Sequence, residues 1–330
     1  MRTENGGKRR NIHITLCIIL SNCYIAMLCG IGVAQAQNFP NRPLRIVTAE
    51  PGGGNDVMAR LLAQGLTASL GQQVIVDNRP SGAIPRGIVA KAPPDGHTVL
   101  FTTGGFWLLP SENETLDVFR DFSPVTLANR QPSILVVHPS SPLKSVKELI
   151  VLAKAKPGEL NYSSGANGSS SHLAAELFNS LAGVKIVRIP YKGAGPAANG
   201  LMANQVHLMF ATAGSVTSYI SSGRLRGLAV SSAQPTELLP GLPTVAASGV
   251  PGYEAVAMFG VFAPARTPSP VVNRLQQEFL QVLNKPDVKE RFMAMGVEVV
   301  GSPPDAFVAT IKADMARMGK IIKDAGIRAE

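Results

Sequence analysis

The most constraining feature of the sequence is an ordered series near its start: a strand, a glycine turn, a helix and a second strand. Residues 43–48 are typical of a strand, and the turn Pro51-Gly52-Gly53-Gly54-Asn55 follows directly. Residues 56–70 place apolar side chains on one helical face, Gly71 is suited to end that helix, and 74–76 are again strand-like. This order is the building unit of a parallel α/β sheet.

The same alternation continues to the end of the chain, so the sequence predicts an α/β protein rather than an all-helical or all-strand one. Hydrophobic residues make up 45% of the chain and charged residues 16%, which indicates a globular fold. Further strands are expected at 98–102, 134–137, 162–164, 186–191, 206–210 and 225–230, and helices at 88–91, 145–155, 171–181, 215–222, 269–283, 286–295 and 304–325.

Two apolar extended runs, 134–139 and 257–264, separate blocks of these units and are candidate crossovers between two lobes. We therefore expect one lobe from residues 37–136 plus 262–330 and a second from 137–261. The alternative is a single open sheet, which this many strands would make very wide.

The N-terminus has the pattern of a secretion signal. Basic residues 8–10 precede the apolar run 12–33, which ends at the small-residue site 34–36, so cleavage is expected between Ala36 and Gln37 and the mature protein in the periplasm. Two alternatives remain open: an uncleaved membrane anchor, and lipid attachment at Cys23.

All three cysteines lie inside this signal, so the mature chain can form neither a disulfide nor a thiolate metal site. No histidine or carboxylate cluster has the spacing of metal ligands, and neither a metal nor a cofactor is expected. The net charge of the whole chain is +9, which suits anionic small molecules. Without dense basic runs, nucleic acid is not an expected partner.

Four glycine- and serine-rich loops follow predicted strands. In the first, 51–56, glycines allow close backbone approach and the following helix offers unpaired N–H groups to an anion. The Lys-Ser/Thr of a P-loop is missing, and a tight turn capped by Asn55 or Asp56 is the alternative.

The second loop, 162–172, gathers serine hydroxyls at a strand end and helix start. It lacks the Gly-x-Ser-x-Gly of a nucleophile elbow, and no nearby carboxylate is placed to orient His172. His172 is therefore either a ligand contact or a polar residue at a helix start. A serine hydrolase using Ser171 or Ser215 remains the less favoured alternative.

The third loop, 190–196, offers the Tyr191 hydroxyl and the Lys192 ammonium, although most lysines simply face solvent. The fourth, 210–215, again places small residues between a strand and a helix. Because ligands of open α/β sheets bind at the carboxyl ends of the strands, four such loops predict a cleft between two lobes.

Together these segments resemble the Bug-type periplasmic receptors of tripartite tricarboxylate transporters. The similarity runs from about 39 to 327 and is carried by Val76-Asp77-Asn78-Arg79-Pro80, by 89–96 and 121–125, by Leu160-Asn161-Tyr162-Ser163-Ser164-Gly165, by Pro190-Tyr191-Lys192-Gly193, and by Leu242-Pro243-Thr244-Val245 and Pro251-Gly252-Tyr253-Glu254.

The resemblance implies a type II periplasmic-binding-protein fold, with two α/β lobes that close by a hinge around a small carboxylate. The implied partners are that ligand and integral-membrane transporter subunits, for a monomeric protein that is not an enzyme; a signalling partner is the alternative. The expected ligand-binding residues are Gly53, Gly54, Asn55, Asp56, Thr103, Ser163, Ser164, Gly165, Ser169, Ser170, His172, Tyr191, Lys192, Ala211 and Thr212.

Three positions depart from the family's pattern. Asn55 stands where Ser or Thr is usual, the loop 81–86 is shortened, and Ala211 replaces a frequent Asp. Loss of that carboxylate predicts weak binding of amino acids. Trp107, the single tryptophan, either faces the cleft and favours a flat or apolar ligand tail, or packs in the core.

Overall fold

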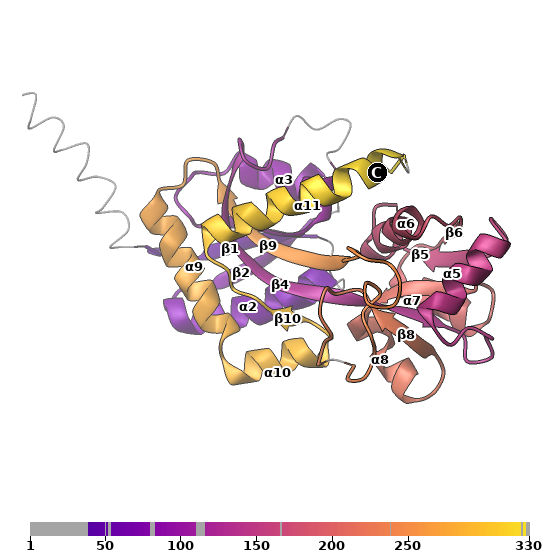
Figure 1. Cartoon of the computed structure of the whole chain (residues 1–330). Coiled ribbons are helices and arrows are strands. Elements are labelled where there is room, and N and C mark those ends of the chain that lie inside the picture. Colours follow the sequence, from indigo (N-terminus) through magenta and orange to yellow (C-terminus); the bar gives the residue numbers. More distant parts are fainter. Residues whose placement is uncertain are drawn as a thin grey trace, which may run out of the picture.

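The computed structural model describes residues 39–49, 51, 54–79, 83–109, 116–165, 167–237, 239–324 and 326–327. The predicted signal peptide and its cleavage site therefore lie outside the described residues. The described chain forms two α/β lobes side by side, with long strands running between them (Figure 1). The predicted α/β fold class is thus confirmed.

The first lobe is built on a mixed sheet. Its outer strands run parallel, because helices connect them, and β9 then pairs antiparallel with both β3 and β4. The order is β2-β1-β3-β9-β4, with the short β10 also on β4. The strands are β1 (Leu44–Thr48), β2 (Val74–Asn78), β3 (Thr98–Thr103), β4 (Phe122–Val137), β9 (Val256–Pro264) and β10 (Glu298–Val299).

The strand β4 belongs to both lobes. Its first part, as far as Pro132, pairs with β9, and Ser133–Val137 pair with β7 and β8 of the second sheet. Residues 134–137 of the run expected at 134–139 are therefore the end of a strand of 16 residues, and 138–139 lie beyond it. The second sheet adds β5 (Asn161–Ser164), β6 (Val187–Pro190), β7 (Leu208–Thr212) and β8 (Arg226–Val230).

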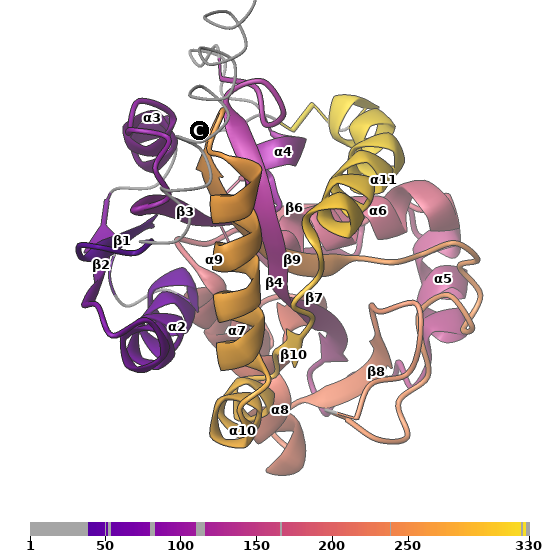
Figure 2. The same ribbon diagram turned by 90° about the vertical axis from the view of Figure 1, so that its left-hand side faces the viewer.

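Helices cover both faces of each sheet (Figure 2). In the first lobe, α2 (Gly54–Leu70), α9 (Ser269–Leu283) and α10 (Pro286–Ala294) share one apolar core, and α3 (Ala83–Ala90), α4 (Gly105–Leu108) and the start of α11 (Pro304–Asp324) share another. In the second lobe, α5 (Val146–Ala155) and α6 (Ser170–Ala182) cover one face, and α7 (Ala194–Met202) and α8 (Ala213–Ser221) the other.

The last helix contacts both lobes. Phe307 and Ile311 pack in the first lobe, whereas Met318, Ile321 and Ile322 belong to the apolar cluster of α5 and α6. A single helix therefore spans the junction beside β4 and β9. The lobe boundaries at 136/137 and 261/262 stay predictions.

Trp107 packs in the core of the first lobe. It is 3% exposed, lies against Phe262 and Phe307, and its indole Nε1–H donates to Asp314 Oδ2 at 2.8 Å. The bond pins α4 to α11. Of the two readings of Trp107, the structure favours core packing.

Within the described ranges, no helix combines the length and apolarity needed to cross a membrane.

Candidate functional site

A cavity of about 370 Å³ lies between the two lobes. Both lobes supply its walls, and six of the expected ligand-binding residues line it: Gly54, Asn55, Thr103, Ser169, Ser170 and Thr212. They come from four different strand–helix connections. The fold therefore brings residues up to 158 positions apart in the chain (Gly54 to Thr212) to one site.

Three helices of nine or more residues begin at this cavity. The helix α2 starts at Gly54, α6 has Ser169 as its N-cap, and α8 starts directly after Thr212. The first N–H groups of a helix have no partner within the helix, and the helix dipole makes this end positive. The cavity wall formed by these termini can therefore hold a carboxylate without a cationic side chain.

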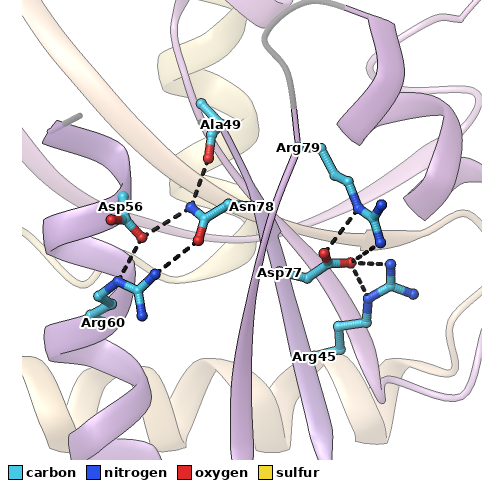
Figure 3. A network of polar contacts seen from close by, with 7 residues as sticks. All are labelled: Arg45, Ala49, Asp56, Arg60, Asp77, Asn78 and Arg79. Carbon is cyan, nitrogen blue, oxygen red and sulfur yellow. Dashed lines mark hydrogen bonds and ion pairs between the residues drawn. The ribbon is translucent and has the colours of Figure 1, made fainter. Parts of the chain in front are cut away.

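A polar network behind the first loop fixes its shape (Figure 3). Asn78, at the end of β2, donates from Nδ2 to the carbonyl of Ala49 at 2.8 Å and to Asp56 Oδ1 at 2.9 Å. Arg60 donates to Asn78 Oδ1 at 2.9 Å and pairs with Asp56 at 2.8 Å. Asn78 thus ties the two ends of the glycine loop together by holding Ala49 and the carboxylate of Asp56, which is only 5% exposed. Asp56 is not among the described residues that line the cavity.

Asp77, the residue before Asn78, has a different role. Arg45 of β1 and Arg79 both form ion pairs with its carboxylate (Figure 3). Asp77 therefore joins β1 to the turn after β2, beside the loop network. In this way the described part of this stretch, 76–79, supports the site without lining the cavity.

The second loop is held by Arg188 of β6, which sequence reasoning missed. Its guanidinium donates to Ser164 Oγ at 2.7 Å, to the carbonyl of Gly165 at 2.9 Å and to Asn167 Oδ1 at 3.2 Å. The first and second loops are therefore both fastened by a side chain from the next strand along the chain. The positive charge of Arg188 also lies close behind this loop, which favours an anion in front of it.

His172 supports the same loop as a neutral ring. It is 6% exposed, and its Nδ1 accepts from the backbone N–H of Gly168 at 3.1 Å. Burial, assisted by the charge of Arg188, lowers the pKa of His172 to about 4. The ring is therefore uncharged at neutral pH, and it lies outside the lining residues.

The serines considered as nucleophiles are engaged within their loops. Ser171 Oγ accepts from the N–H of Gly165 at 3.1 Å and lies 3.1 Å from Ser169 Oγ. Ser215 Oγ donates to the carbonyl of Thr212 at 2.7 Å. Both hydroxyls thus stabilise the turns that present the helix N-termini.

The other expected residues that the structure describes do not line the cavity. Ser163 and Ser164 are buried under the second loop, Lys192 is exposed, and Tyr191 packs against α7 with its hydroxyl facing Gln205. Gly53 falls outside the described residues. Gly165 is buried in the loop held by Arg188.

Ala211 is fully buried in β7, and its methyl group belongs to the core under α7 and α8. The strand continues to Thr212, two residues beyond its expected end. The expectation about amino acids relied on a cleft position for residue 211. Weak binding of amino acids therefore stays a prediction.

Sequence reasoning also missed one wall of the cavity. Glu254 precedes β9, and Asp314, Arg317 and Met318 come from α11. Glu254 belongs to a segment that carries the family resemblance, but no motif in the sequence of α11 indicated a ligand-binding role. Only the packing of α11 across both lobes brings its side chains to the cavity.

Comparison with known proteins decides the family. Residues 58–327 match the family described as "Tripartite tricarboxylate transporter family receptor". The chain belongs to this receptor family. A Pseudomonas protein from the tcbD-tcbE intergenic region is 37% identical to the receptor over 96% of this chain and 94% of its own length, and BugT of Bordetella pertussis is 34% identical over 96% and 99%.

Solved structures agree with this family. An R. palustris protein with adipate has a TM-score of 0.76 and 36% identity to the receptor, covering 88% of this chain and 99% of its own. MatC from Rhodopseudomonas palustris, with bound malate, has a TM-score of 0.73 and 26% identity over 86% and 100%. The resemblance read from the sequence and the periplasmic-binding-protein fold are both confirmed.

The loop network gives a first prediction. Asn78→Ala removes the bonds to Ala49 and Asp56, so the first loop of the receptor loses its tie and a bound carboxylate should dissociate about tenfold more readily, on the order of 1.4 kcal/mol. Asn179→Ala is the matched control, because Asn179 makes two backbone bonds to Ile186 far from the cavity. Calorimetric titration measures the affinity of both variants for a carboxylate. Equal affinities would show that Asn78 does not shape the binding site.

Proposed function

We propose that the receptor captures a small organic carboxylate in the cavity between its lobes and delivers it to a membrane transporter. The observation that carries this proposal is the convergence of the N-termini of α2, α6 and α8 on one cavity. Opposed helix N-termini, supplied by two lobes, bind an anion most strongly when the lobes close around it.

The relatives support a carboxylate as the anion. Adipate and malate, bound to the two R. palustris proteins, are both small dicarboxylates. The cavity of about 370 Å³ lies at the lower end of the roughly 300–1,000 Å³ usual for ligand pockets, which suits molecules of this size. Di- and tricarboxylates and aromatic acids are the classes to consider.

The hydrogen bonds within the loops fit ligand binding better than catalysis. Ser171 and Ser215 hold the turns with their hydroxyls, and His172 is a neutral acceptor for a backbone N–H. All three side chains therefore hold the loops that carry the helix N-termini, which is a role in binding rather than in catalysis. The paired strands β4 and β9 join the lobes and form the hinge on which closure depends.

The receptor acts in the periplasm as a monomer in this proposal, after export and cleavage near Ala36. Its closed form is what the membrane subunits of the transporter recognise. Gly54, Asn55, Thr103, Ser169, Ser170 and Thr212 contact the ligand, and Asp56, Ser164, Gly165 and His172 shape the loops that do so.

Thermal unfolding in the presence of a carboxylate panel tests the proposal. A ligand at a hundredfold excess over its Kd raises the free energy of unfolding by about 2.7 kcal/mol. Succinate, adipate, citrate, hexanoate and benzoate are each compared with the corresponding neutral amide. Stabilisation by a carboxylate but not by its amide is expected; stabilisation by none of them at millimolar concentration would reject the proposed function.

A further inference from the structure

The charged residues among the described residues of the cavity wall form one cluster. Arg317 donates from Nη1 to Glu254 Oε2 at 2.7 Å and from Nη2 to Asp314 Oδ1 at 2.7 Å. Asp314 Oδ2 accepts from Trp107 Nε1 at 2.8 Å. Two carboxylates therefore share one guanidinium, and this part of the wall carries a net charge of −1.

The cluster is held in place and partly shielded from water. The Asp314 side chain is 5% exposed and both of its oxygens are bonded. Glu254 is 34% exposed, and its Oε1 has no partner among the described residues. Glu254 thus presents a hydrogen-bond acceptor in the wall of the cavity, while its other oxygen is fixed by Arg317.

This cluster lies across the cavity from the start of α2, one of the helix N-termini proposed to form the carboxylate anchor together with the starts of α6 and α8. The helix α2, which supplies Gly54 and Asn55, packs on one face of the first sheet, and α11 packs on the opposite face (Figure 2). A ligand anchored at the start of α2 therefore extends its other end toward α11. That end meets a negative wall with an available acceptor rather than a cation.

The wall between the two ends is apolar. Its side chains are Leu108, Leu173, Val256, Met258, Phe259 and Met318. Methionine side chains adapt to the shape of an apolar or aromatic group, so Met258 and Met318 suit a rigid or bulky ligand body. A polar body such as that of citrate would lose hydration here without gaining partners.

We infer that the ligand is a monocarboxylate with an apolar body and a neutral hydrogen-bond donor, such as a hydroxyl, at its far end, and that Glu254 selects this end group. The inference rests on the proposed carboxylate capture. A second carboxylate at the far end is repelled by the net negative cluster, whose one cation already serves two carboxylates. A hydroxyl donates to Glu254 Oε1 and meets no such repulsion.

Calorimetry with two matched series tests this selection. One series is hexanoate, 6-hydroxyhexanoate and adipate, and the other is benzoate, 4-hydroxybenzoate and terephthalate. In the wild-type protein the hydroxy acid is expected to bind at least tenfold more tightly than the diacid of its series. In Glu254→Gln, which neutralises the wall and keeps an oxygen for Arg317, the preference for hydroxy acid over diacid is expected to fall about tenfold.

The control is Glu298→Gln. Glu298 pairs with Arg130 at 2.7 Å and lies outside the cavity, so this variant removes the same charge and the same kind of ion pair. The Glu298→Gln variant should prefer the hydroxy acid over the diacid to the same extent as the wild type. Unfolding curves of both variants confirm that each is folded.

The outcomes distinguish the role of Glu254 from carboxylate capture. A wild-type protein that prefers the diacids, or a Glu254→Gln variant with an unchanged preference, overturns the role of Glu254 and leaves carboxylate capture intact. A protein that binds no member of either series contradicts carboxylate capture itself.

Discussion

Ser170→Asp is expected to abolish ligand binding while leaving the receptor folded. Ser170 is the first residue of α6 and lines the cavity. An aspartate there interacts favourably with the helix dipole, so the helix should persist. Its carboxylate, however, occupies the anchor and repels a second anion about 4 Å away by roughly 4 kcal/mol, which corresponds to a loss of affinity of more than about a hundredfold. Calorimetry with hexanoate or benzoate measures the loss.

The matched control is Ser269→Asp. Ser269 is the first residue of α9, is exposed, and lies outside the cavity, so the same substitution should leave affinity unchanged. If Ser170→Asp binds carboxylates as well as Ser269→Asp does, the start of α6 is not part of the anchor.

Gly214→Ala is expected to destabilise the fold by about 2 kcal/mol, within the range that overpacking costs. Gly214 lies in the first turn of α8, and a Cβ there would stand 1.9 Å from the carbonyl oxygen of Met295, at the end of α10. This contact joins a helix of the second lobe to one of the first, and the obstacle is backbone, which cannot rotate away. Urea unfolding gives the change in the free energy of unfolding.

Gly195→Ala provides the comparison. Gly195 also lies in a helix, α7, but a Cβ there meets nothing within 4 Å, so alanine should be neutral or stabilising by up to about 1 kcal/mol. Equal stability of the two variants would contradict the close approach of α8 to α10.

Most regular elements of the first lobe could be predicted from local patterns, because their causes are local. The apolar face of α2 and the glycine after it are adjacent in the chain, and Gly71 has the positive φ of 62° expected of a residue that ends a helix. Gly183 ends α6 in the same left-handed conformation. The position of the cavity followed from a second local rule, that loops at the carboxyl ends of strands meet.

The residues that fasten and complete the site could not be predicted in this way. Asn78 and Arg188 each bond to a loop that lies one helix and one strand earlier in the chain. These bonds form only because pairing in the sheet places the two segments side by side. The wall of the cavity depends on still more distant pairs: Glu254 with Arg317, 63 residues apart, and Trp107 with Asp314, 207 residues apart. No local pattern marks one member of such a pair as the partner of the other.

The most direct test of the central claim is calorimetric titration of the receptor with a carboxylate and its neutral isostere, such as benzoate and benzamide. Helix N-termini that bind through backbone donors and dipoles require the negative charge. The carboxylate is expected to bind saturably at one site, and the amide at least a hundredfold more weakly. Binding of the amide with equal affinity would contradict a carboxylate anchor at the starts of α2, α6 and α8.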